Sequence, residues 1–167
     1  MLIVALAALA WARLPAWIVP AYAWWTTIGV ALAFIDVAVR RLPDRLTWTA
    51  AGGFLALAAP AVWHGYGSAW LRAAGSAALL TVVIGLCAWA WPALIKHGDV
   101  KYGAAIGGAA GWVSWFALYA AVFTATFLGA LVGIGLIATG RASRRSHLPF
   151  GPFLLTGTLL VVVLTRL

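Results

Sequence analysis

The chain has 167 residues, of which 65% are hydrophobic and only 8% are charged. Soluble domains carry about 25% charged residues, so this composition excludes an ordinary soluble domain, and it also excludes a disordered chain. Lys and Arg number 11 against 3 acidic residues, giving a net charge of +8. The basic residues stand in short segments between apolar runs, which favours membrane topology over a nucleic-acid partner.

A membrane-spanning helix needs about 20 mostly apolar residues. The sequence predicts six such spans: 17–39, 46–63, 70–93, two within 101–139 that join near 112–118, and 149–165. A shorter apolar run, 2–12, can be an additional N-terminal span or a signal peptide, although no basic segment precedes it. We therefore expect an all-α, polytopic transmembrane helical bundle of about six spans, forming one domain over residues 1–167.

Helix-breaking and helix-capping residues predict where the helices begin and end. Pro43 breaks the chain after the first span, and Thr47 is a candidate cap for the second. Gly103, Gly107 and Gly111 are spaced four apart, which places them on one helix face and predicts close helix packing there.

The basic residues sort to one side of the membrane. Three loops hold 8 of the 11: Arg40, Arg41 and Arg45; Lys96 and Lys101; and Arg141, Arg144 and Arg145. Two predicted spans separate each loop from the next, so all three loops lie on one face. The positive-inside rule makes that face cytoplasmic, in a multi-pass protein of the inner or plasma membrane.

Each of the three carboxylates needs a reason. Asp36 lies in an apolar run near the cytoplasmic end of the first span, and Asp99 opens the fourth. The two-span hairpin between them returns the chain to the same face, so the two acids lie at similar depth. Ionisable groups at membrane depth are costly and indicate function. Two neighbouring carboxylates can share one proton, the arrangement of an aspartic protease, in which one activates water while the other polarises the scissile carbonyl.

Simpler explanations stand beside this one. Asp36 can form a helix-end ion pair with Arg40 or Arg41, and Asp99 can cap the helix that follows it. Asp44 is most simply a turn residue after Pro43. A single cysteine, Cys87, and histidines confined to predicted loops argue against a metal site, and no cofactor is expected.

Three ordered motifs resemble those of the type IV prepilin peptidases, polytopic aspartic proteases of the GxGD class. The segment 36–47 resembles the element Asp-x6-Pro-(Asp/Asn)-x-Leu-Thr, with Pro43 as its proline. Gly98-Asp99-Val100-Lys101 resembles Gly-x-Gly-Asp-(Phe/Val)-Lys, although Lys96 replaces the first glycine. The segment 148–153, with Pro149-Phe150-Gly151-Pro152, is similar to the turn that precedes the last helix of the family.

The resemblance implies that Asp36 and Asp99 are the catalytic pair, with Pro43, Gly98 and Lys101 as supporting motif residues. It implies an active site that faces the cytoplasm and a prepilin or pilin-like substrate held by its hydrophobic helix, with a short basic leader removed after a Gly. The N-terminal insert of the bifunctional members, with its paired cysteines and methyltransferase activity, is not recognised in this sequence, so the short peptidase-only members are the expected match.

Two other functions use the same features. A small ion- or proton-coupled transporter can employ the same carboxylates, although transporter sites usually lie near the midplane of the membrane. A catalytically inactive scaffold of pilus assembly is the second alternative, which Lys96 keeps open. The sequence does not indicate an oligomeric state.

Overall fold

The structure, a computed structural model, describes residues 8–9, 11–12, 14–39, 42–91, 97–141 and 149–165. Over these residues the chain is helical, and the helices follow in this order: α2 (Val19–Val39), α3 (Asp44–Ala58), the 3₁₀ helix η1 (Ala59–His64), α4 (Gly67–Ala90), α5 (His97–Val113), α6 (Trp115–Ala138) and α7 (Gly151–Thr165). The predicted all-α fold is confirmed.

The helices correspond to the six predicted spans. Four segments are long and apolar enough to cross a membrane, namely α2, α3 together with η1, α4 and α6, and α7 is a shorter apolar helix of the same kind. α5 has 17 residues and begins at His97, four residues before the predicted start. The run 2–12 lies mostly outside the described residues, so the additional N-terminal span stays a prediction.

Local chemistry explains where the helices break. Ser114 adopts an extended conformation between α5 and α6, and its Oγ accepts a hydrogen bond of 2.9 Å from the Ala117 N–H, as an N-cap serine does. This confirms the predicted junction near 112–118. The prediction that Thr47 caps the second helix is wrong. Pro43 occupies the N-cap position of α3, and the Thr47 hydroxyl donates to the Asp44 carbonyl oxygen inside the first turn.

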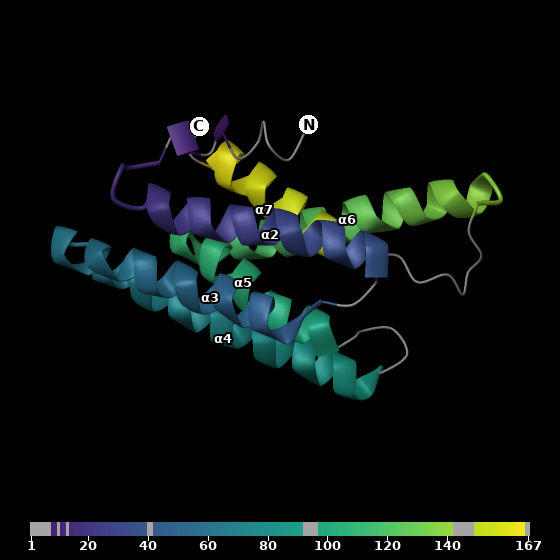
Figure 1. Cartoon of the computed structure of the whole chain (residues 1–167), viewed down its shortest axis with the longest axis horizontal. Helices are drawn as coiled ribbons and strands as arrows, with labels where there is room; N and C mark the ends of the chain where they lie inside the picture. The colour runs from purple at the N-terminus through teal and green to yellow at the C-terminus, as the bar shows by residue number, and fades with distance from the viewer. Residues whose placement is uncertain are drawn as a thin grey trace.

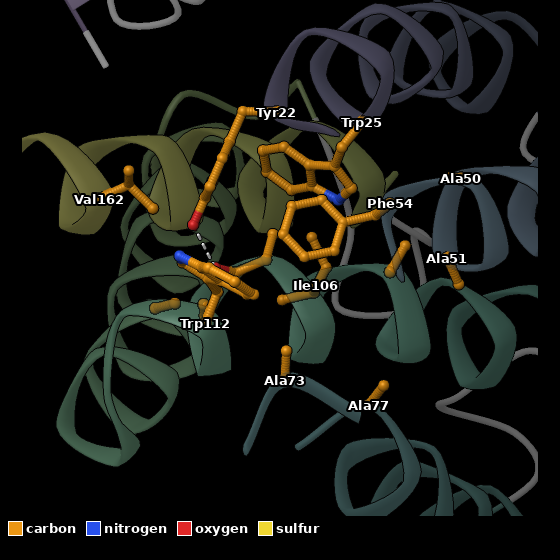
Figure 2. Close-up of a cluster of buried hydrophobic side chains, with 14 of the residues drawn as sticks. Tyr22, Trp25, Ala50, Ala51, Phe54, Ala73, Ala77, Ile106, Trp112 and Val162 are labelled. Atoms are coloured by element: carbon orange, nitrogen blue, oxygen red, sulfur yellow. Dashed lines mark hydrogen bonds between the residues drawn. The ribbon is translucent and has the colours of Figure 1, made fainter. Parts of the chain in front are cut away.

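α5 lies at the centre of the bundle. It packs against α2, α3, α4, α6 and α7, and every residue from Tyr102 to Trp112 is buried. Figure 1 shows α2 and α7 side by side on one side of α5, with α3 and α4 on the other. Figure 2 shows how large side chains of α2 and α3 meet those of α5. Among them, the Tyr22 and Phe54 rings pack edge to face with centroids 5.2 Å apart.

The closest helix packing joins α4 to α5 through the predicted glycine face. A Cβ at Gly107 would lie 2.5 Å from the Ser76 carbonyl oxygen and 2.9 Å from the Ala77 Cα, and one at Gly111 would collide with the Ser76 side chain. Apolar surface gives helices little reason to associate inside lipid, so van der Waals contact between closely approaching backbones holds them together. The glycines of α5 provide that contact with α4.

Arg72 of α4 fixes the far end of α5. Its Nε donates to the Gly111 carbonyl oxygen at 2.7 Å, and its Nη2 donates to the carbonyl oxygens of Trp112 and Val113 at 2.6 and 3.1 Å. The last carbonyls of a helix lack partners within the helix, and a cation there also offsets the negative end of the helix dipole. The side chain therefore caps α5 and ties it to α4.

Candidate active site

Asp36 ends the buried face of α2. Tyr22, Gly29 and Asp36 are spaced seven residues apart, or two turns, and all three are buried. Asp36 is only 6% exposed, whereas its neighbour in sequence, Val37, is 57% exposed. The local sequence therefore aims this one carboxylate into the bundle, toward α7.

The N-terminus of α7 binds this carboxylate. The Gly151 N–H donates a hydrogen bond of 2.9 Å to Asp36 Oδ2. Gly151 is the first residue of α7, where backbone N–H groups lack helical partners and the helix dipole carries partial positive charge. A Cβ at position 151 would lie 3.0 Å from Oδ2, so glycine permits this close approach. The alternative ion pair of Asp36 with Arg40 or Arg41 involves residues outside the described part of the chain.

Asp99 lies in the first turn of α5 and is partly buried. It is the third residue of the described helix, so it sits inside the first turn rather than at the N-cap position. A carboxylate in the first turn interacts favourably with the positive end of the helix dipole. The segment before it touches the loop that follows α2, because a Cβ at Gly98 would lie 3.0 Å from the Leu42 Cβ.

Contacts between α2 and α5 set their relative direction. The Tyr22 hydroxyl donates to the Ala109 carbonyl oxygen at 2.7 Å, and the Tyr102 hydroxyl lies 3.3 Å from the position of a Cβ at Gly29. These contacts are seven residues apart on each helix and run in opposite directions, so the helices are antiparallel. When this register is continued toward the start of α5, the first turn of α5 lies beside the part of α2 between Gly29 and Asp36.

Lys101 and Asp44 join α5 to the start of α3. Lys101 Nζ lies 2.5 Å from Asp44 Oδ2, and the two side chains are 26% and 65% exposed. The simple interpretation of Asp44 as a turn residue is incomplete, because it is the first residue of α3 and one half of an ion pair. Pro43, directly before it, is exposed at the N-cap position of α3. This ion pair stands two residues after Asp99 on α5 and ties that helix to the start of α3.

Reasoning from sequence named most residues of this candidate site, but it gave no role to Gly151 and did not single out Tyr102. Gly151 stood out only as part of the Pro-Phe-Gly-Pro segment, and its bond to Asp36 joins residues 115 apart in the sequence. Tyr102 drew no attention, although it stands three residues after Asp99 on the same side of α5. Its side chain is fully buried and its hydroxyl has no hydrogen-bond partner in the described part of the chain. Lys96 lies outside the described residues.

The three sequence motifs therefore converge on one end of the bundle. The first contributes Asp36 and the Pro43-Asp44 pair, the second contributes Asp99 and Lys101, and the third contributes the Gly151 N–H. In this cluster one carboxylate is buried away from water, and a backbone N–H donates to one of its oxygens. A second carboxylate lies on a neighbouring helix. This chemistry suits proton transfer to and from a polar substrate group.

Comparisons with known proteins show the family of the chain. Residues 21–134 match the profile of the type IV leader peptidase family. A prepilin leader peptidase/N-methyltransferase of Aeromonas hydrophila is 32% identical over 143 residues, which cover 77% of this chain and 44% of that protein. One of Burkholderia pseudomallei (strain 1026b) is 34% identical over 134 residues, with 77% and 41% covered.

A third relative is the leader peptidase HopD of Escherichia coli, 43% identical over 61 residues, which are 36% of this chain and 37% of that protein. The chain spans less than half the length of the first curated relatives it matches. No solved structure matches it. The family profile covers more than half of the chain, including both candidate acids, and the apolar helices indicate a multi-pass membrane protein. The chain belongs to the type IV leader peptidase family.

Proposed function

We propose that this chain is a membrane aspartic endopeptidase that removes the short basic leader from type IV prepilin-like precursors. Asp36 and Asp99 share one proton at the cytoplasmic face. One carboxylate takes a proton from water as the water attacks the scissile carbonyl, and the other gives its proton to the carbonyl oxygen. Collapse of the tetrahedral intermediate returns a proton to the leaving amine, and the cut follows a Gly of the precursor.

The convergence of the three motif segments carries this proposal. Asp36 is buried and bound by the N-terminus of α7, while Lys101, two residues after Asp99, is paired with Asp44. A buried carboxylate with a backbone donor on one oxygen is held in a fixed orientation, as a proton-transfer group requires. The positive-inside rule supports a cytoplasmic position for this end of the bundle, because the basic loops predicted from the sequence adjoin it.

Single substitutions of the acids test the catalytic pair. Asp36→Asn and Asp99→Asn each keep the size of the side chain but cannot exchange the proton, so each should abolish leader removal while the protein remains in the membrane. The measurement is co-expression with a precursor that has a basic leader, a Gly and a long apolar helix, followed by a gel shift. Full processing by either variant would contradict the proposal.

Asp44→Asn is the matched control, because it removes the third carboxylate of the chain and only an exposed ion pair. Pairs of this exposure contribute roughly 0–1 kcal/mol to stability, so processing should persist. The same purified protein in liposomes tests the transporter alternative, which predicts proton or ion flux and no cleavage. An inactive scaffold predicts neither, and restoring glycine at position 96 should then produce cleavage.

A further inference from the structure

Leu42 is a buried residue in the connection between α2 and α3. It is only 9% exposed, whereas Pro43, Asp44 and Arg45, which follow it, are all exposed. An apolar side chain that is buried beside exposed neighbours makes a packing contact, and that contact holds the connection in one position. The partner of Leu42 therefore shows what this connection is attached to.

That partner is Gly98, in the first turn of α5. A Cβ at position 98 would lie 3.0 Å from the Leu42 Cβ and 3.6 Å from its Cγ and Cδ1. Among the described residues, the glycines with a positive φ are Gly65 and Gly140, so the backbone conformation at position 98 does not require glycine. The lack of a side chain there instead gives Leu42 the room to lie against the backbone of α5.

The turn of α5 that carries Asp99 contacts the segment 42–44 on both sides of that acid. Gly98, directly before Asp99, meets Leu42, and Lys101, two residues after it, is paired with Asp44. The two side chains of the ion pair are 26% and 65% exposed, and pairs of that exposure contribute little to stability. The buried side chain of Leu42 is therefore the main attachment of this turn to the segment.

Pro43 prepares Leu42 for this contact. A residue that precedes proline is restricted to extended backbone conformations, so little conformational entropy is lost when the direction of the Leu42 side chain is fixed. Pro43 itself occupies the N-cap position of α3 with φ −66° and ψ 127°, and it has no N–H that would need a partner there. The Leu42-Pro43 pair therefore presents an apolar side chain in a preset direction.

We propose that Leu42 is a positioning residue of the active site, because its side chain, packed against Gly98, fixes the turn of α5 that carries Asp99. The connection that holds Leu42 begins where α2 ends, three residues after Asp36, so it joins the two helices that carry the acids. Leu42 acts through Asp99 and contacts no reacting atom. This role in turnover rests on the proposed peptidase function.

Leu42→Ala and Leu14→Ala form a matched pair, because the two leucines are 9% and 7% exposed and Leu14 precedes α2, at the end of that helix opposite to Asp36. Both variants should lower the unfolding temperature in detergent, since each leaves a cavity. Only Leu42→Ala should also lower kcat, by about tenfold, with a KM within about twofold of the parent. Leu42→Met keeps the volume and should retain most of the kcat. A parental kcat in Leu42→Ala, or equal losses of kcat in both alanine variants, overturns the proposal.

Gly98→Ala tests the same contact from the side of α5. The added Cβ lies 3.0 Å from the Leu42 Cβ and should push Leu42 away, which lowers kcat in the parent. In a Leu42→Gly background the Cβ that it meets is gone, so Gly98→Ala should lower kcat no further. Equal fractional losses in the two backgrounds show that the two positions do not interact, and they overturn the proposal.

Thiol labelling at position 99 separates this inference from the proposed function. Asp99 is partly buried, so in a Cys87→Ser background the rate at which Asp99→Cys reacts with a water-soluble maleimide reports how often this turn opens. Leu42→Ala should raise that rate about threefold or more, and Leu14→Ala should leave it unchanged. If the parent cuts no precursor, the proposed function fails while the labelling rates still test the attachment. Equal rates with and without Leu42→Ala overturn the inference even where Asp99→Asn abolishes cleavage.

Discussion

Position 151 admits only glycine without displacing the carboxylate it serves. A Cβ there would lie 3.0 Å from Asp36 Oδ2 and 3.4 Å from the Asp36 Cβ, a tighter approach than side chains usually make. The same residue supplies the N–H that binds Oδ2 at 2.9 Å. Gly151 therefore meets two requirements at once. Its N–H donates to the carboxylate, and its lack of a side chain lets the carboxylate lie this close.

Gly151→Ala should therefore reduce leader removal by about tenfold or more, because a shift of a few tenths of an ångström moves a reacting group out of position. The unfolding temperature should change little, since the carboxylate can move aside. Gly52→Ala is the control, since a Cβ there meets nothing within 4 Å, and alanine at an open helical site is neutral or stabilising. Steady-state cleavage of a leader peptide compares the two variants. Parental rates in Gly151→Ala would show that this contact is unimportant.

Single residues could be named from the sequence wherever their chemistry was unusual for their setting. Asp36 stood out because a carboxylate in an apolar run needs a reason. The partners of such residues could not be named, because they depend on how distant segments pack. Gly151 and Tyr102 are ordinary for a membrane helix until α2 lies beside them. The prediction that Thr47 caps α3 was wrong, because Pro43 alone can start α3 without a side-chain cap.

At the scale of the elements, α5 shows what composition can and cannot predict. Its boundary at Ser114 follows from local chemistry, and its glycine spacing predicts close packing. Its central place does not follow, because α5 has only 17 residues and a polar first turn. The physical reason is that glycine and alanine dominate its second half, so neighbouring helices can approach from every side. The partner of the glycine face, α4, becomes known only from the fold.

Neighbouring glycines of α5 offer a sharp test of the α4 contact. A Cβ at Gly107 would meet backbone atoms of Ser76 and Ala77, which cannot rotate away, whereas one at Gly108 would lie 3.5 Å from the Phe54 ring, an ordinary contact. Gly107→Ala should destabilise the protein by roughly 1–3 kcal/mol, the usual result of overpacking. Gly108→Ala should be tolerated. Thermal unfolding in detergent compares them, and equal unfolding temperatures would contradict the assigned helix contact.

For the molecule as a whole, the decisive expectation is that Asp36 and Asp99 meet. The antiparallel register of α2 and α5 supports this, because the Tyr22 and Tyr102 contacts align the start of α5 with the end of α2. The cytoplasmic side of the basic loops stays a prediction, whereas the apolar helices of the described part of the chain were predictable from hydropathy alone. The pairing of two particular helices was not, because any bundle of six apolar helices can be arranged in several ways.

Cross-linking tests this pairing without reference to catalysis. In a Cys87→Ser background, the pair Asp36→Cys and Asp99→Cys should be joined efficiently by a short bifunctional thiol reagent. The pair Val37→Cys and Asp99→Cys is the control, because Val37 neighbours Asp36 in sequence but is 57% exposed on another face of α2. Mobility on a denaturing gel reports the cross-link. Equal yields from the two pairs would contradict the arrangement.

The bond from Gly151 to Asp36 also bears on biosynthesis. The ribosome synthesises Asp36 early, but the N–H that binds it arrives 115 residues later, at the start of the last described helix. Until that helix inserts beside α2, the acid lacks its backbone donor, so a nascent chain with several helices already in the bilayer still has an unfinished centre. The carboxylate therefore gains its backbone donor only after α7 has been synthesised. A polypeptide truncated before α7 should be membrane-bound yet inactive.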